Sequence, residues 1–197
     1  LVNLYAEPYT HCTPSQTRGV PMLLEADVNA IPGSSSVETV YNQILSDLDN
    51  AEQYLNVEEW ELGKNYRFNT TSAQALRART YLYMGRWSDA LEASKDVLSV
   101  YNELEDMNNS TTLPNSYKSK ESIVALERFS SNLYTAVDMP ASEFISLYRS
   151  GDQRRTKYFK RVTSSTYSLL KGRSDEFSCS FRTAEFYLTA AEAAARL

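Results

Sequence analysis

The chain has 197 residues, of which 42% are hydrophobic and 23% charged, with only six glycines and six prolines. This composition is typical of a globular protein with a substantial core, and it excludes a collagen-like or wholly disordered chain. The net charge of −5 gives no support for nucleic-acid binding, and no apolar run approaches the length of a membrane span. Fourteen tyrosines stand beside one histidine and two cysteines, so aromatic rings are the feature to explain.

Both ends of the sequence are expected to be cuts through a longer protein. The first residues contain no initiator methionine and no basic or continuous apolar segment of a signal peptide. The last residues, Ala193 to Leu197, lie inside a strongly helical pattern without a stop signal. The compartment therefore cannot be inferred from a leader.

Residues 1–35 are predicted to be irregular, because prolines and glycines interrupt them repeatedly. A helix is predicted over residues 36–55, with Ser35 as its N-cap and Glu38 completing a capping box. Its apolar residues recur at spacings of three and four, as an amphipathic helix requires: Val37, Val40, Ile44, Leu48, Ala51 and Leu55.

A polar connection over residues 56–69 carries Trp60, Tyr66 and Phe68. A second helix is expected to start after residues 70–72 and to end at Gly85, which adopts a left-handed conformation without a Cβ clash. A third helix follows, with Ser88 as its cap and Tyr101 near its end. Such a short connection predicts antiparallel neighbouring helices.

The second and third helices carry the residue spacing of a tetratricopeptide repeat, in Ala78, Tyr81, Gly85, Trp87 and Ala90. Small alanines let helices approach closely, while the large rings fill the gaps between them. One such unit cannot bury its own faces, so it needs stacking partners, and the helix over residues 36–55 is the obvious one.

The second half of the chain mixes loops with short elements. We expect a polar loop over 102–120, a strand over 122–129, a helix between Pro140 and Gly151, a weak hairpin of 158–162 with 167–170, and a last helix over 181–197. The predicted fold class is mainly α, with tetratricopeptide-like helical hairpins, long irregular loops and a few short strands. The predicted segments are 1–35, irregular; 36–101, tetratricopeptide-like; and 102–197, loop, strands and further helices.

Five blocks in this order resemble the SusD/RagB-like nutrient-binding proteins. They are residues 40–48 (VYNQILSDL), 73–90 (AQALRARTYLYM with WSDA after it), 121–124 (ESIV), 152–154 (DQR) and 181–193 (FRTAEFYLTAAEA). No single block is decisive, since a repeat pattern alone is common. The five together, in the family's order, extend over roughly residues 36–195, so they make a much stronger signal.

The resemblance implies a cell-surface, outer-membrane lipoprotein of Bacteroidetes that captures glycans and delivers them to a SusC-like TonB-dependent transporter. It implies a binding protein and not an enzyme, with no cofactor and no metal. The family's leader, lipidated cysteine and remaining segments would lie outside this sequence, and the membrane would be reached only through that lipid anchor.

Aromatic residues in loops are the candidate ligand contacts, because flat rings suit the apolar C–H faces of sugars. Tyr134 ranks first, with Asn132 beside it, because it follows the predicted strand about where the resembled family places such contacts. Trp60 and Tyr66 rank second.

Other readings stay open. A helical-repeat scaffold that binds a protein or peptide needs only the repeat spacing. A polysaccharide-cleaving enzyme would rest on the acidic clusters at 58–61 and 103–106, but adjacent loop acids do not define the carboxyl pair of a glycosidase. Arg182 and Glu185 are expected to form a structural pair on the last helix, and the basic cluster over 149–161 to be a solvated edge. Cys12 and Cys179 could pair or stay as two buried thiols.

Overall fold

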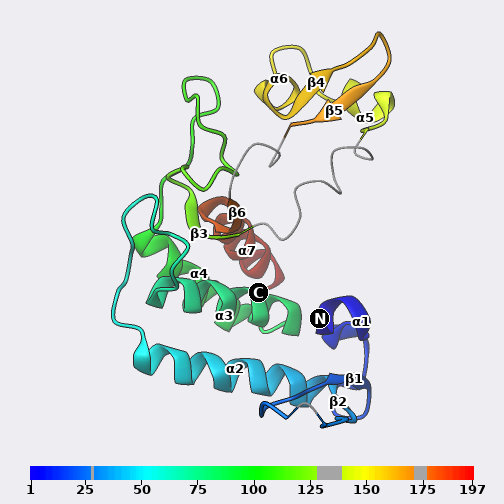
Figure 1. Cartoon of the computed structure of the whole chain (residues 1–197), viewed down its shortest axis with the longest axis vertical. Coiled ribbons are helices and arrows are strands. Elements are labelled where there is room, and N and C mark those ends of the chain that lie inside the picture. The colour runs from blue at the N-terminus through cyan, green and yellow to red at the C-terminus, as the bar shows by residue number, and fades with distance from the viewer. Residues whose placement is uncertain (28, 128–138, 171–176) are drawn as a thin grey trace. The chain divides into compact units, whose positions relative to one another are not determined.

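The computed structural model describes residues 1–27, 29–127, 139–170 and 177–197, with the backbone alone for residues 127 and 177–179 (Figure 1). The described chain forms two compact units. The first comprises Leu1–Glu58, Asn69–Ser99 and Phe186–Leu197, and the second comprises Glu59–Phe68 and Val100–Glu185.

Three helices dominate the first unit and confirm the prediction for this part of the chain. They are α2 (Val37–Tyr54), α3 (Thr70–Met84) and α4 (Trp87–Val100). Only Gly85 and Arg86 connect α3 to α4, and α4 runs back in the opposite direction (Figure 1). The mainly α, tetratricopeptide-like fold class is therefore confirmed.

The helix starts differ from the predictions by one to three residues. The N-cap of α2 is Ser36, not Ser35, because the Ser36 hydroxyl accepts the hydrogen bond from the Thr39 backbone nitrogen. Asn69 caps α3, with its side chain and that of Ser72 forming a reciprocal capping box, so α3 begins at Thr70. The third helix begins at Trp87, one residue before the predicted cap.

The prediction of an irregular N-terminal segment is wrong in part. It contains the short helix α1 (Val2–Tyr5), the 3₁₀ turn η1 (Tyr9–His11), and the antiparallel strands β1 (Arg18–Pro21) and β2 (Ser34–Ser36). Glycine permits this pairing, because a Cβ at position 19 would lie 2.9 Å from the Ser35 carbonyl oxygen.

The N-terminal segment packs on α2 in a core of Val2, Val37, Val40, Tyr41 and Met84. The Tyr41 hydroxyl donates a hydrogen bond to Asn3 at 2.5 Å, and the Tyr41 ring meets the Tyr9 ring edge to face at 5.1 Å. Burial raises the pKa of the Tyr41 hydroxyl to about 12. This tyrosine is thus a packing residue, as its helical position predicts.

An ion-pair cluster ties α3 to α2. The Arg77 guanidinium lies 2.9 Å from the carboxylates of both Asp49 and Glu52. Burial alone would lower the pKa of Arg77, but hydrogen bonds with Tyr81, Glu52 and Asp49 outweigh burial and raise it. Ion pairs as well as apolar packing therefore fix the position of α3 against α2.

Two strand pairs organise the second unit. Strand β3 (Ser122–Glu127) pairs antiparallel with β6 (Phe177–Arg182), with Ser122 opposite Arg182. Strands β4 (Phe159–Arg161) and β5 (Tyr167–Leu169) form the predicted hairpin. Strand β3 confirms the predicted strand up to residue 127, and residues 128–129 lie outside the description.

Three further helices correct expectations; the first two belong to this unit, whereas most of the last belongs to the first unit. Helix α5 spans only Ser142–Ser146, so the helix expected between Pro140 and Gly151 is shorter than predicted. Residues 153–158, expected as a turn and the start of a strand, form the one-and-a-half-turn helix α6 (Gln153–Tyr158), whose first turn the Asp152 side chain caps. Helix α7 (Thr183–Arg196) starts two residues later than expected, because Phe181 and Arg182 pair with β3.

No helix within residues 1–27, 29–127, 139–170 and 177–197 is both long and apolar enough to cross a membrane. Cys12 is a half-buried free thiol whose Sγ lies 3.8 Å from the Tyr9 carbonyl oxygen. The two alternatives for Cys12 and Cys179, a disulfide or two buried thiols, involve the side chain of Cys179, which lies outside the description.

Candidate functional site

The structure describes two of the four site residues that the sequence predicts. Tyr134 and Asn132 lie outside the described residues. Trp60 and Tyr66 lie in the second unit, in the segment that precedes α3. Their role as ligand contacts stays a prediction.

Arg67 brings Trp60 and Tyr66 together. Its guanidinium carbon lies 5.1 Å from the centre of the Trp60 ring and 5.5 Å from that of Tyr66. The Trp60 indole nitrogen donates a hydrogen bond to the Phe68 carbonyl oxygen at 3.1 Å, which fixes the orientation of the ring. Stacked cations of this kind hold aromatic rings in place on a surface.

Trp60 also lines a cleft of about 340 Å³, which we call the Trp60 cleft. Its other lining residues are largely polar: Glu59, Leu62, Asn65, Val100, Tyr101, Asn102, Glu103, Ser119, Lys120 and Ser122. The volume lies in the range of small-ligand sites, and two aromatic side chains, Trp60 and Tyr101, among amides and charges are a composition that suits a sugar.

Hydrogen bonds make the polar side of the Trp60 cleft rigid. Asn65 is buried, and its side-chain nitrogen donates to the Tyr117 carbonyl at 2.8 Å and to the Ser122 hydroxyl at 2.9 Å. Lys120 pairs with Glu103 at 3.1 Å, and this hydrogen bond and charge raise the pKa of Lys120. The cleft therefore presents pre-organised donors and acceptors.

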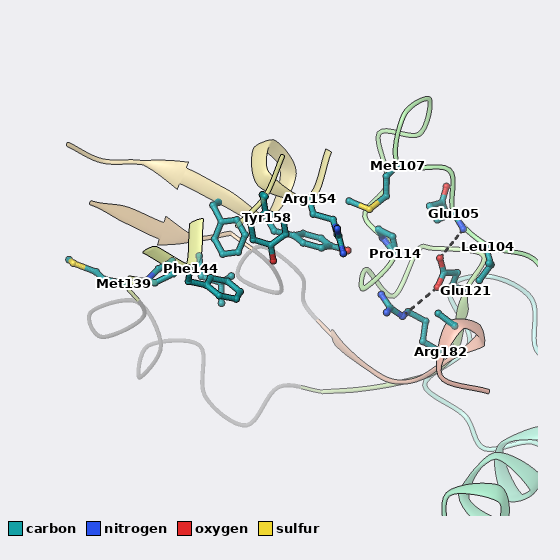
Figure 2. A pocket seen from close by; sticks show the side chains of 15 residues that line it. Leu104, Glu105, Met107, Pro114, Glu121, Met139, Phe144, Arg154, Tyr158 and Arg182 are labelled. Carbon is teal, nitrogen blue, oxygen red and sulfur yellow. Dashed lines mark hydrogen bonds and ion pairs between the residues drawn. The ribbon is translucent and has the colours of Figure 1, made fainter. Parts of the chain in front are cut away.

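A second and larger pocket, of about 1040 Å³, opens in the same unit (Figure 2). We call it the Glu121 pocket. It is lined by Leu104, Glu105, Met107, Pro114, Glu121, Met139, Pro140, Phe144, Tyr148, Arg154, Tyr158, Phe159, Leu169, Arg182 and Ala184.

Three packed rings form one wall of the Glu121 pocket. The ring centres of Phe144 and Phe159 each lie 5.6 Å from that of Tyr148, and the two phenylalanine rings lie 6.1 Å apart. Phe159 is buried, and it packs in one cluster with the buried Ile145 and Tyr158. Helix α5 and the β4–β5 hairpin thus present a firm apolar surface to the pocket.

A buried carboxylate, Glu121, lies on the other side. One of its oxygens accepts a hydrogen bond from the Glu105 backbone nitrogen at 2.8 Å, and the second lies 3.4 Å from Nε of Arg182 (Figure 2). Burial raises the pKa of the neighbouring Tyr158 hydroxyl, and Arg182 partly offsets that rise. Arg182 therefore belongs to strand β6 and contacts Glu121, and the expectation that it lies on the last helix is wrong.

Much of the basic cluster over 149–161 serves local structure. Arg154 donates to both carboxylate oxygens of Asp152, at 2.7 Å for the shortest contact, and covers the Tyr148 ring. Lys157 donates to the carbonyl oxygens of Met107 and Ser110, and so ties the 107–110 loop to α6.

Sequence reasoning did not find the Glu121 pocket. Glu121 and Arg182 each stand in a block that resembles the SusD/RagB-like family, and the pairing of β3 with β6 brings these two blocks together. The presence of one charged residue in each of these two blocks was the signal by which the sequence could have indicated this contact. The described residues include no group of three or more histidine, cysteine or acidic side chains that could hold a metal ion.

Solved structures share this fold. A SusD superfamily protein from Bacteroides thetaiotaomicron matches with a TM-score of 0.75 and 23% identity, over 96% of this chain and 50% of that one. A SusD-like carbohydrate binding protein from Bacteroides vulgatus gives 0.67 and 20%, over 90% and 44%. Surface glycan-binding protein A from Bacteroides uniformis gives 0.69 and 19%, over 90% and 50%.

The chain therefore has the fold of SusD-like proteins, and the resemblance seen in its sequence is confirmed at the level of the fold. It spans about half the length of these structures. No protein-family model and no curated protein matches the sequence.

Proposed function

We propose that this chain is part of a cell-surface glycan-binding protein that delivers its ligand to a TonB-dependent outer-membrane transporter. Two solved structures with this fold bear names that describe carbohydrate or glycan binding. The observation on this chain that carries the proposal is the Trp60 cleft, where an oriented indole ring lies among fixed polar side chains.

The chemistry of the Trp60 cleft fits a sugar ring. A pyranose has an apolar C–H face that packs on an aromatic ring and an edge of hydroxyls that need donors and acceptors. Trp60 supplies the first, and Asn102, Glu103 and Lys120 supply the second. The cleft volume of about 340 Å³ limits it to one or two sugar units.

A binding role without catalysis accounts for the acidic clusters. Glu61 pairs with Lys64 and Glu103 with Lys120. Glu105 accepts a hydrogen bond from Ser119 at 2.9 Å, while Asp106 caps its own turn by accepting from the Asn108 backbone at 2.8 Å. Four of the acidic residues thus have partners in the local structure, and Glu103 also lines the Trp60 cleft.

Substitution of Trp60 tests the proposal. The full-length protein is screened against a glycan panel by affinity electrophoresis, and the best ligand is titrated by calorimetry. We expect Trp60→Ala to weaken binding about tenfold or more, since aromatic stacking on a ligand contributes roughly 1–3 kcal/mol. Trp60→Phe should retain part of the affinity, because it keeps an apolar face.

Phe68→Ala is the matched control, because Phe68 is an exposed ring in the same segment that does not line the cleft. Unchanged affinity in Trp60→Ala would refute the assignment of the cleft. Tyr134→Ala tests the first-ranked sequence prediction in the same assay, with the same expected loss. A protein that binds no glycan on the panel would refute the function itself.

A further inference from the structure

One carboxylate oxygen of the Glu121 pocket has an ion-pair partner but receives no hydrogen bond from the described residues. Glu121 is 3% exposed, and its Oε1 accepts a hydrogen bond from the Glu105 backbone at 2.8 Å. Its Oε2 is buried, lies 3.4 Å from Arg182, and accepts no hydrogen bond from the described residues. Buried carboxylate oxygens are normally saturated with donors, because leaving one unmatched costs free energy. Glu121 lines the pocket, where a ligand hydroxyl can supply the donor that the described residues do not.

The facing wall favours a ligand with an apolar face. Phe144 is 46% exposed although it packs against Tyr148 and Phe159, so its ring offers free surface to the pocket. Figure 2 shows Phe144 and Glu121 on opposite sides of the pocket. A volume of about 1040 Å³ accommodates several linked sugar units between them.

The charges of the pocket favour a neutral ligand. Arg154 donates hydrogen bonds to both carboxylate oxygens of Asp152, and Arg182 forms an ion pair with Glu121. The carboxylates of Glu105 and Glu121 both line the pocket, and both would repel an acidic sugar. A hydroxyl group, which donates without carrying charge, is the group that fits beside Glu121.

The same two chain segments line both the Glu121 pocket and the Trp60 cleft. In the segments 103–105 and 119–122, Glu103, Lys120 and Ser122 line the Trp60 cleft, whereas Glu105 and Glu121 line the larger pocket. Neighbouring residues of the same two segments thus serve two different cavities of one unit.

We propose that the Glu121 pocket is a second sugar-binding site, selective for a neutral oligosaccharide. One sugar ring packs on Phe144 and Tyr148, and a hydroxyl of another unit donates a hydrogen bond to Glu121 Oε2. The proposal rests on the glycan-binding function, but it assigns a site separate from the Trp60 cleft.

Calorimetry of the full-length Trp60→Ala variant tests the second site. The probes are four neutral hexasaccharides (cellohexaose, maltohexaose, laminarihexaose and mannohexaose) and the acidic hexagalacturonate. We expect saturable binding of at least one neutral hexasaccharide to persist in Trp60→Ala, and hexagalacturonate to bind at least tenfold more weakly.

Two further substitutions in this background locate the binding. Glu121→Gln keeps an oxygen for the Glu105 nitrogen but replaces the open acceptor with an amide donor, so affinity should fall about tenfold. Phe144→Ala removes an exposed ring and should cause a similar loss. Leu147→Ala is the matched control, because Leu147 follows the same helix, is 76% exposed, and does not line the pocket.

The outcomes separate the two proposals. If the Trp60→Ala variant retains no saturable binding, or if its binding is unaffected by both pocket substitutions, the second site is refuted and the Trp60 cleft stands. Preferential binding of hexagalacturonate also refutes the proposed selectivity. If the unsubstituted protein binds none of these probes and no glycan on the wider panel, the glycan-binding function falls as well.

Discussion

At position 85 the backbone has a φ of +70°, a left-handed conformation that favours glycine. The space is also occupied, because a Cβ there would lie 2.7 Å from Cγ2 of Thr10. Gly85 therefore ends α3 and also lets the N-terminal segment approach the α3–α4 connection. The sequence predicted the first of these roles, and the structure adds the second.

We expect Gly85→Ala to lower the free energy of unfolding by about 1–3 kcal/mol, since it adds a steric conflict to the backbone strain. Gly63→Ala is the matched control. Gly63 has a φ of +93°, but a Cβ there would meet nothing within 4 Å, so only the strain of roughly 1 kcal/mol applies. Urea denaturation measures both values. An equal loss in the two variants would show that the contact with Thr10 contributes nothing.

Single residues of the candidate site were partly predictable. Trp60 was recognised as a loop aromatic, and it does line a cleft. The sequence did not indicate that Arg67 stacks on both Trp60 and Tyr66, because stacking depends on the path of the backbone between adjacent residues. Glu121 was noted only as the first residue of a motif, since its partner Arg182 is distant in the chain.

At the scale of elements, Arg77 links α3 to α2 through ion pairs. This side chain is 12% exposed and reaches two carboxylates of α2, those of Asp49 and Glu52, at 2.9 Å each. A partly buried cation with two partners contributes more than an exposed surface pair. The α2–α3 packing should therefore depend on charge as well as on apolar contact.

We expect Arg77→Met to lower the free energy of unfolding by about 1–2 kcal/mol at low salt, and by less in 1 M NaCl, where ion pairs are screened. Lys95→Met is the control, since Lys95 is an exposed cation on α4 without an ion pair among the described residues. Denaturant titration at both salt concentrations gives the comparison. Equal effects of the two substitutions would remove Arg77 from the α2–α3 interface.

Elements with a long, regular pattern were predicted well; among the short ones, β3 and the β4–β5 hairpin were predicted, but α6 and β6 were not. Helices α2 and α4 carry several turns of periodic apolar residues, which define a face without reference to other segments, and α3 is bounded by its Asn69 cap and by Gly85. Helix α6 has six residues and depends on the Asp152 cap, and β6 exists through its partner β3. Such elements are decided by a few contacts, and local periodicity does not encode them.

At the scale of the whole molecule, the chain spans about half the length of the SusD-like structures it matches. The proposed delivery to a transporter and the proposed lipid anchor therefore concern the full-length protein. They distinguish a glycan-capturing surface protein from the alternative, a free helical-repeat scaffold for a protein partner.

We expect the full-length protein, tagged at its C-terminus and purified from detergent-solubilised outer membranes, to co-purify with a TonB-dependent β-barrel transporter. Metabolic labelling with an alkyne analogue of palmitate should label it, and substitution of the lipidated cysteine should abolish the label. Mass spectrometry of the purified complex provides the measurement. A soluble partner in place of the transporter, together with no lipid label, would favour the scaffold.

The sequence by itself determined the helical core of this protein and its likeness to SusD-like proteins. Both follow from residues close together in the chain, where apolar spacing and capping residues act locally. Only the tertiary structure decided which side chains share a cavity. Glu121 and Arg182, or Trp60 and Lys120, meet through strand pairing and loop packing between distant segments. The placement of a binding site depends on such long-range contacts, and so it was not readable from local pattern.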